Sequence, residues 1–331
     1  MDQNSKIRSN KYQEKSWSKQ HNKLFSLANF IHKYSIFRIT GKTPKCILTF
    51  YGHLFGKLMI RNRKYLTKLR KSILTLFPTL SPKLTNKIIN GHKAYMGALM
   101  LDAMLYSPNI NYKTADQFIK FKNIDLLDKE LAKRKGVIVV SAHIGWFFHV
   151  IAGLAYHPNR YNVLTLVQPA NMKLYEYIVS RPEIRNILKL IPMDKFKDFK
   201  SRIFSHLSEK NGIFLILHDY SKFSHTKIEF WDNQMKLKIA TPNSAAYLAL
   251  QTSARIIITI PHPNRTIGNT LYEFIECEEI NKLIENSAKE MDEQHFYEIN
   301  KSINAKLAQY IIQYLHLWEE LPNLIYRIAD E

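Results

Sequence analysis

The chain of 331 residues contains little cysteine and little glycine, and each shortage excludes a class of site. Its two cysteines, Cys46 and Cys277, lie far apart and form no CxxC or cysteine–histidine spacing, which argues against a disulfide framework and against a zinc site. The ten glycines form neither GxGxxG nor a GxxxxGKS/T loop, so no nucleotide-phosphate cradle is expected. A GxSxG elbow is also missing, which argues against Ser141 as a hydrolase nucleophile. We therefore expect neither a metal nor a cofactor.

Long uncharged hydrophobic runs are missing as well. Residues 1–20 are polar throughout and lack the apolar region of a signal peptide. Apolar stretches such as CILTFYGHLFGKLMI are interrupted, here by His53 and Lys57, before they reach the ~18 to 20 residues that a membrane-spanning helix needs. The sequence predicts a chain without a transmembrane segment, in a cytoplasmic, reducing compartment, whose N-terminal third can lie on the inner face of a membrane.

Acidic residues are nearly absent from the N-terminal quarter. Residues 1–90 hold 19 Lys and Arg but only Asp2 and Glu14 as acids, a net charge of 19 − 2 = +17 out of the +20 of the whole chain. An anionic partner is therefore expected to meet this quarter. A basic helical face is predicted there, ending before Pro78, which is either a solvated surface or a contact with phospholipid head groups or an acidic carrier protein. It consists of Lys57, Arg61, Lys64, Lys68 and Lys71.

From Gly136 onward, short β-branched runs alternate with helical patterns. Continuous apolar strands between helices predict an α/β fold: a mostly parallel sheet covered by helices, preceded by an N-terminal helical region. The predicted strands are GVIVVSA, YNVLTLV, GIFLILHD and ARIIITI, and the predicted helices span residues 145–156, 171–189, 195–210, 241–253 and 292–320. The expected organisation is a polar basic tail over 1–22, a basic helical region over 23–110 and an α/β domain over 111–331.

One stretch carries candidate chemistry, GVIVVSAHIGWFFHV, in which an apolar strand runs into His143. Ligands of open α/β sheets collect at the carboxyl ends of the strands, where His143 is expected to lie. The end of GIFLILHD places His218 and Asp219 at the same rim. The residues alone leave two interpretations open, a histidine general base or a structural histidine at a strand end.

Five segments, in order over about residues 50–325, resemble the lysophospholipid and lipid A acyltransferase family. They are RKSILTLFPTLSPKLTNKII, VIVVSAHIGW, LYEYIVSRPEIRNILKLI, HLSEKNGIFLILHDYS and IEFWDNQMKLKIATPNSAAYLALQTSARIIITI. The resemblance implies acyl transfer from a thioester, with His143 as the base that takes the proton of the acceptor hydroxyl. It also implies that Arg185, and next to it Arg181, pairs with phosphate on the substrate or its carrier.

The sequence departs from the family at one important position. The family motif H-x-x-x-x-D/E has an acid five residues after the histidine, and here that residue is Phe148. None of the thirteen histidines has an acid at that spacing. In serine proteases the loss of a comparable carboxylate lowers kcat by about 10⁴, so an active enzyme needs a replacement.

Three interpretations of this departure follow. In the first, an acid from elsewhere in the fold replaces the missing one, with Asp219 as first choice and Glu229 as second. In the second, His149 takes part, although a hydrogen-bonded structural histidine is the simpler interpretation. In the third, the site has lost acyl transfer and binds lipid, or has been adapted to another acceptor. Further candidate substrate contacts are Gly145, Trp146, Phe148, His218 and Trp231.

The function predicted from these observations is that of an O- or N-acyltransferase. Its expected partners are acyl carrier protein or acyl-CoA as donor, an anionic membrane surface, and a lipid or other amphipathic acceptor. The alternative is a degenerate or repurposed family member that binds lipid, carrier protein or a protein partner. A nucleic-acid-binding function is not favoured despite a pI near 9.7, because no reader motif is present.

Overall fold

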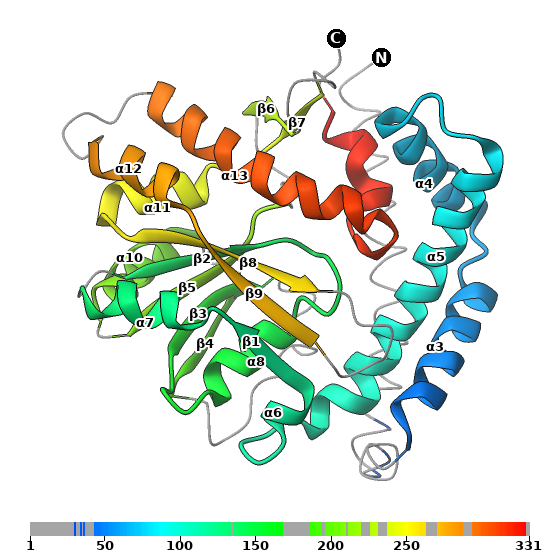
Figure 1. Cartoon of the computed structure of the whole chain (residues 1–331), viewed down its shortest axis with the longest axis horizontal. Helices are drawn as coiled ribbons and strands as arrows, with labels where there is room; N and C mark the ends of the chain where they lie inside the picture. The colour runs from blue at the N-terminus through cyan, green and yellow to red at the C-terminus, as the bar shows by residue number, and fades with distance from the viewer. Residues whose placement is uncertain are drawn as a thin grey trace.

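The computed structural model describes most of the chain as a central sheet with helices on both faces (Figure 1). Its description covers residues 43–133, 136–167, 186–192, 196–209, 211–219, 226–230, 237–262, 270–286 and 293–328, together with Phe30, Tyr34 and Ile36. Within residues 43–101, three helices form a layer along one side of the sheet domain (Figure 1). They are α3 (Lys45–Met59), α4 (Arg63–Leu76) and α5 (Pro82–Leu101).

In the described residues, the main sheet has seven strands in the order β1-β9-β8-β2-β5-β3-β4. The five strands from β8 to β4 are parallel, whereas β9 runs antiparallel to β8 and pairs in parallel with β1. The strands are β1 (Ile119–Lys122), β2 (Val137–Ser141), β3 (Asn162–Val167), β4 (Leu188–Pro192), β5 (Gly212–Leu217), β8 (Arg255–His262) and β9 (Thr270–Glu276). A separate antiparallel pair joins β6 (Lys227–Glu229) to β7 (Lys238–Ala240).

Hydrophobic cores cover both faces of the sheet. In β2, Val137 and Val139 belong to one core, and Ile138 and Val140 belong to the other. Burial on both faces explains why the central strands are continuous apolar runs without polar alternation. The first core includes α7 (Asp125–Ala132) and α8 (His149–Tyr156). The second includes α10 (Phe196–Ser208), α11 (Ser244–Thr252), α12 (Glu278–Asn286) and α13 (Glu293–Gln313).

The predicted fold class is confirmed, and the four predicted strands correspond to β2, β3, β5 and β8. Three predicted helix boundaries are wrong. The last helix, expected over 292–320, ends at Gln313 as α13, and Leu315–Leu317 form a 3-10 turn. The helix expected over 145–156 begins only at His149, because Gly145 has a φ of +57° and residues 145–148 form bends and a turn. The helix expected over 171–189 does not reach its predicted end, since Leu188 begins β4; residues 171–185 lie outside the described residues.

The predicted basic face does not belong to one helix. The chain leaves α3 after Met59, and α4 begins after Asn62, whose side chain accepts hydrogen bonds from the backbone N–H groups of Lys64 (2.9 Å) and Tyr65 (3.3 Å). This N-cap starts a new helix, so Lys57 lies on α3 while the lysines from Lys64 onward lie on α4. Ser81 caps α5, and Pro82 stands in its first turn.

Glycines bring α3 and α5 into close contact. A Cβ atom on Gly56 would lie 1.9 Å from the backbone oxygen of Lys93, and one on Gly97 would lie 2.2 Å from that of Gly52. The two helix backbones therefore touch where only glycine fits. None of the helices in the described ranges combines the length and hydrophobicity needed to cross a bilayer.

We expect Gly56→Val to destabilise the fold. The added side chain must displace the backbone of α5, and overpacking of this kind costs about 1 to 3 kcal/mol or more. Urea unfolding followed by circular dichroism measures the loss. Leu58→Val is the matched control on the exposed side of α3, with an expected change within about 0.5 kcal/mol. Equal stability of the two variants would contradict the close packing.

Candidate active site

The register of two parallel strands brings His143 and Asp219 together. Ser141 at the end of β2 pairs with Leu217 at the end of β5, and the N–H of His218 donates to the carbonyl of Ser141 over 2.8 Å. The chain then leaves both strands at the same edge of the sheet. The imidazole Nδ1 of His143 lies 2.8 Å from Oδ1 of Asp219, and the backbone N–H of His143 donates to Oδ2 over 2.9 Å.

The carboxylate of Asp219 is also held by the C-terminal segment of the chain. The indole N–H of Trp318 donates to its Oδ2 over 2.6 Å. The guanidinium of Arg327 donates to the backbone carbonyls of Asp219 and Ala240. The side chain of Asp219 is only 1% exposed, whereas that of His143 is 18% exposed. The acid is thus buried and fully coordinated, while its histidine partner reaches the surface.

Opposing effects set the protonation of this pair. Burial alone would lower the pKa of His143, but the charge and hydrogen bond of Asp219, with smaller contributions from Glu320 and Glu319, outweigh burial and raise it to about 9. Burial alone would raise the pKa of Asp219, but the charge and hydrogen bond of His143, with Arg327 and Trp318, lower it. The pair therefore favours an aspartate and an imidazolium at neutral pH.

Two further carboxyl groups come from the segment that carries Trp318. The N–H of Glu319 donates to the carbonyl of His143 over 2.8 Å, and the side chain of Glu320 accepts a hydrogen bond from Asn323. Burial raises the pKa of Glu319 to about 7 and also raises that of Glu320. Both groups favour the protonated imidazole through their charge. Sequence inspection gave no sign that these acids would lie near His143.

The loop after His143 is fixed from both sides. Gly145 occupies the left-handed region, its N–H donates to the carbonyl of Leu317 over 3.1 Å, and its carbonyl accepts from the hydroxyl of Tyr95 on α5 over 2.6 Å. The hydroxyl of Tyr272 on β9 donates to the carbonyl of Trp146. The loop cannot change course without breaking these bonds, so the position of His143 is determined by helix, sheet and C-terminal segment together.

Aromatic side chains fill the space in which the family motif would place its acid. Trp146, Phe147 and Phe148 are each 5% exposed and belong to the core that contains α8. The ring of Phe147 meets that of His143 edge to face, with centroids 4.8 Å apart. Phe148 packs between Phe147 and His149. The missing carboxylate is therefore replaced at its own position by core packing.

His149 belongs to a different hydrogen-bonded cluster. Its Nε2 lies 2.7 Å from Oδ2 of Asp102 and 3.0 Å from the hydroxyl of Ser107, and its Nδ1 lies 3.5 Å from the hydroxyl of Thr270. Asp102 begins the π-helical turn η1 (Asp102–Tyr106), which continues α5. These partners are those expected of a structural histidine, and the structure does not bring His149 into the His143–Asp219 pair.

The remaining predicted residues have different outcomes. His218 is buried, and neither ring nitrogen has a hydrogen-bond partner in the described part of the chain. Burial, assisted by Arg327, lowers its pKa to about 3, so it is neutral. Glu229, the second choice of acid, pairs instead with the hydroxyl of Tyr297 and, at 3.6 Å, with Lys238. The other three predicted contacts, Arg181, Arg185 and Trp231, lie outside the described residues.

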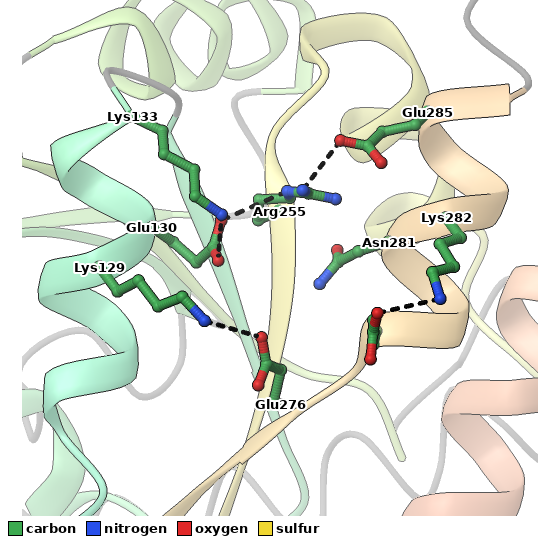
Figure 2. Close-up of a pocket in the computed structure, with 9 residues that line it drawn as sticks. Lys129, Glu130, Lys133, Arg255, Glu276, Asn281, Lys282 and Glu285 are labelled. Carbon is green, nitrogen blue, oxygen red and sulfur yellow. Dashed lines mark hydrogen bonds and ion pairs between the residues drawn. The ribbon is translucent and has the colours of Figure 1, made fainter.

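A cavity of about 220 Å³ lies at the opposite end of the sheet (Figure 2). Arg255 begins β8 beside the first residue of β2, so this cavity opens at the amino ends of the strands. Arg255 pairs with Glu130 (3.3 Å) and Glu285 (2.8 Å), and Lys133 pairs with Glu130 (2.8 Å). Lysines and carboxylates around it are paired as well, as Figure 2 shows. The cavity is lined by ion pairs that join β8 to α7 and α12, and it is separate from His143.

Comparison with models of protein families gives a match over most of the chain. The family model for bacterial lipid A biosynthesis acyltransferases matches residues 16–318. This range includes the His143–Asp219 pair and ends at Trp318, nine residues before Arg327 (327 − 318). A search of curated proteins finds no match.

We expect Trp318→Phe to lower kcat about tenfold with little change in KM. The variant keeps an aromatic ring against Phe230 but removes a hydrogen bond to a charged group, worth about 1.5 to 3 kcal/mol. Steady-state kinetics measures the split between kcat and KM. The proton NMR resonance of the His143 Nδ1–H should shift as well, because its acceptor carboxylate has lost a donor.

Phe230→Leu is the control, since it disturbs the same stack, whose ring centroids are 5.7 Å apart, without removing a donor. It should lower stability while leaving kcat and the resonance near their wild-type values. An unchanged kcat and resonance in Trp318→Phe would show that the indole does not position Asp219.

Proposed function

Because the chain belongs to the bacterial lipid A biosynthesis acyltransferase family, we propose that it transfers a fatty acyl chain from a thioester donor to an amphipathic acceptor. The donor is acyl carrier protein or acyl-CoA, and the acceptor is a hydroxyl or amine on a lipid. The observation that carries this proposal is the 2.8 Å contact between His143 and Asp219. Asp219, in the turn after β5, would provide the carboxylate that the motif after β2 lacks.

Each member of the pair has one role in the proposed reaction. With Nδ1–H donated to Asp219, the imidazole is in the tautomer whose Nε2 accepts the proton of the acceptor hydroxyl or amine. The acceptor then attacks the thioester carbonyl, and the thiolate leaves and takes the proton from the imidazolium. Asp219 stays ionised throughout, orients the ring and stabilises the imidazolium, as the carboxylate of a serine-protease triad does.

The substrate contacts follow from the resemblance and from the charge of the chain. We propose that Arg185, with Arg181, binds a phosphate group of the donor or acceptor, because guanidinium and phosphate match in two parallel hydrogen bonds. The N-terminal quarter, with its net charge of +17, fits an anionic membrane surface on the cytoplasmic side or an acidic carrier.

Acyl transfer from a radiolabelled acyl-carrier donor to total membrane lipid tests the proposal. His143→Ala should abolish transfer, and Asp219→Asn should lower kcat by about 10⁴, as in the serine-protease case. Glu229→Gln is the matched acid control, because Glu229 pairs with Tyr297 and Lys238, and it should retain wild-type transfer.

The opposite result supports the alternative function. If folded wild-type protein binds lipid but neither it nor any variant transfers acyl chains, the chain is a family member that has kept binding and lost catalysis. The buried Phe148 at the motif position is the observation that favours this alternative.

A distinctive pH profile should accompany the transfer activity. The pKa of His143 is about 9, so its base form is scarce at neutral pH, and kcat/KM should rise with pH until about 9. Removing the negative charge in Asp219→Asn lowers the pKa of His143, so the residual activity should rise at lower pH than in wild type. The pKa of His143 sets the range of interest, which is pH 6 to 9. If the kcat/KM of wild type is constant over this range, His143 is not a general base whose pKa Asp219 raises.

A further inference from the structure

The C-terminal segment pairs with the loop after β2 as a short antiparallel ribbon. Ile144 and Trp318 form an isolated antiparallel bridge, and the N–H of Glu319 donates to the carbonyl of His143 over 2.8 Å. Residues that face each other across two such strands place their side chains on the same face, about 4.5 to 5.5 Å apart at Cβ. Glu319 is therefore the cross-strand neighbour of His143, on the face of the ribbon opposite to that of Ile144 and Trp318.

The carboxyl group of Glu319 is not used to hold the fold together. Glu319 is partly exposed, and its carboxyl oxygens have no hydrogen-bond or ion-pair partner within the described ranges. The two neighbouring acids differ from it. Asp219 accepts hydrogen bonds from His143 and from an indole, and Glu320 accepts one from Asn323. Glu319 is thus the acid beside His143 whose carboxyl group remains open to a ligand.

The surroundings of Glu319 favour a cation. In the described part of the chain, the groups whose charge acts on it are His143 and two further acids, and no lysine or arginine is among them. Tyr65 on α4 and Tyr95 on α5 face it from the N-terminal layer. Burial, followed by the charge of Glu319, raises the pKa of both phenols, so they stay neutral. A carboxylate with aromatic rings is the chemistry that recognises an ammonium group, whereas a phosphate would be repelled by the acids.

The number of proton acceptors at the site also fits an ammonium group. A hydroxyl loses one proton when it is acylated, and one base is sufficient for it. A primary ammonium loses two protons, one before its nitrogen can attack and one after the C–N bond has formed. The imidazole of His143 and the carboxylate of Glu319 are two proton acceptors on one face of the same ribbon.

We propose that Glu319 selects an acceptor with a primary ammonium group and that the acyl chain is transferred to its nitrogen. The carboxylate binds the ammonium and takes its first proton, which then passes to solvent. The free amine attacks the thioester carbonyl, so that a C–N bond forms and the C–S bond breaks. His143 takes the second proton and gives it to the departing thiolate. The inference rests on the proposed function, because it names the class of acceptor for the same site.

A matched pair of acceptors tests this selection. Hexadecylamine and hexadecanol have the same chain and differ in the group that is acylated, and each is offered in detergent micelles with the radiolabelled acyl-carrier donor. Wild type should acylate the amine about tenfold more efficiently, the ratio that one hydrogen bond to a charged group confers. Glu319→Gln should raise KM for the amine about tenfold without lowering transfer to the alcohol. Glu319→Asp keeps the charge and should restore most of the preference.

Glu320→Gln is the matched acid control, because Glu320 is bonded to Asn323 and is not the residue opposite His143. It should change transfer to the two acceptors by the same factor and so leave their ratio at the wild-type value. Lysophosphatidylethanolamine, which carries a hydroxyl and a primary ammonium, shows which group is acylated. Its product should be an amide, which survives mild alkali. Circular dichroism verifies that each variant is folded.

A binding measurement separates recognition of the ammonium from catalysis. Octylammonium chloride, titrated below its micelle-forming concentration, should shift the NMR resonances of the His143 imidazole. Glu319→Gln should weaken this binding about tenfold, whereas octanol should give a smaller shift that does not depend on Glu319. This outcome without acyl transfer to any acceptor would contradict the proposed function but support recognition of an ammonium group by Glu319.

Other results would overturn the inference and leave the proposed function in place. One is transfer by wild type to hexadecanol at a rate equal to or above that to hexadecylamine. Another is an amine preference that is unchanged in Glu319→Gln. The third is an alkali-labile ester as the product from lysophosphatidylethanolamine, because the ammonium would then be a head group beside the attacking hydroxyl. Binding of octylammonium that is equal in wild type and Glu319→Gln would overturn the inference as well.

Discussion

The carboxylate of Asp219 is the point at which three distant parts of the chain meet. It accepts two hydrogen bonds from His143 after β2 and one from Trp318 near the C-terminus, while Arg327 holds its backbone carbonyl. A buried carboxylate without partners would cost several kcal/mol, so these donors are needed for it to stay charged. The C-terminal segment is therefore part of the site, because without it the acid beside His143 would lose both its indole donor and the guanidinium behind it.

The geometry shows how a carboxylate that follows another strand can lie beside the histidine of the motif. In the family motif the carboxylate follows the histidine along the chain, whereas here it follows β5, the hydrogen-bonded neighbour of β2. Parallel strands end at one edge, so residues that follow neighbouring strands lie close whatever their separation in sequence. If Asp219 is the replacing acid, as we propose, the motif position is available to Phe148 as a core residue, and the acid lies where Trp318 and Arg327 bury it.

The sequence predicted the parts of this arrangement that depend on local pattern. The apolar runs of the sequence located β2 and β5. Because both strands end at the same edge of the sheet, a contact between His143 and Asp219 could be predicted. The catalytic roles of the two residues stay a prediction. Trp318, Glu319 and Arg327 were missed because their positions result from packing after α13, which no periodicity reveals. The loop at Gly145 was mistaken for helix because its left-handed φ depends on tertiary bonds to Leu317 and Tyr95.

Charge is distributed differently in the N-terminal helices and around His143. The N-terminal helices hold cations without acids, whereas the imidazole of His143 faces Asp219 and the nearby Glu319 and Glu320. These carboxyl groups raise the pKa of His143. At neutral pH the imidazolium form of its side chain therefore predominates over the neutral form. In the proposed acyl transfer that balance would favour the intermediate in which His143 has taken the acceptor proton, because the positive ring is the form that the three acids stabilise. A raised pKa makes His143 a stronger base that is less often in its base form.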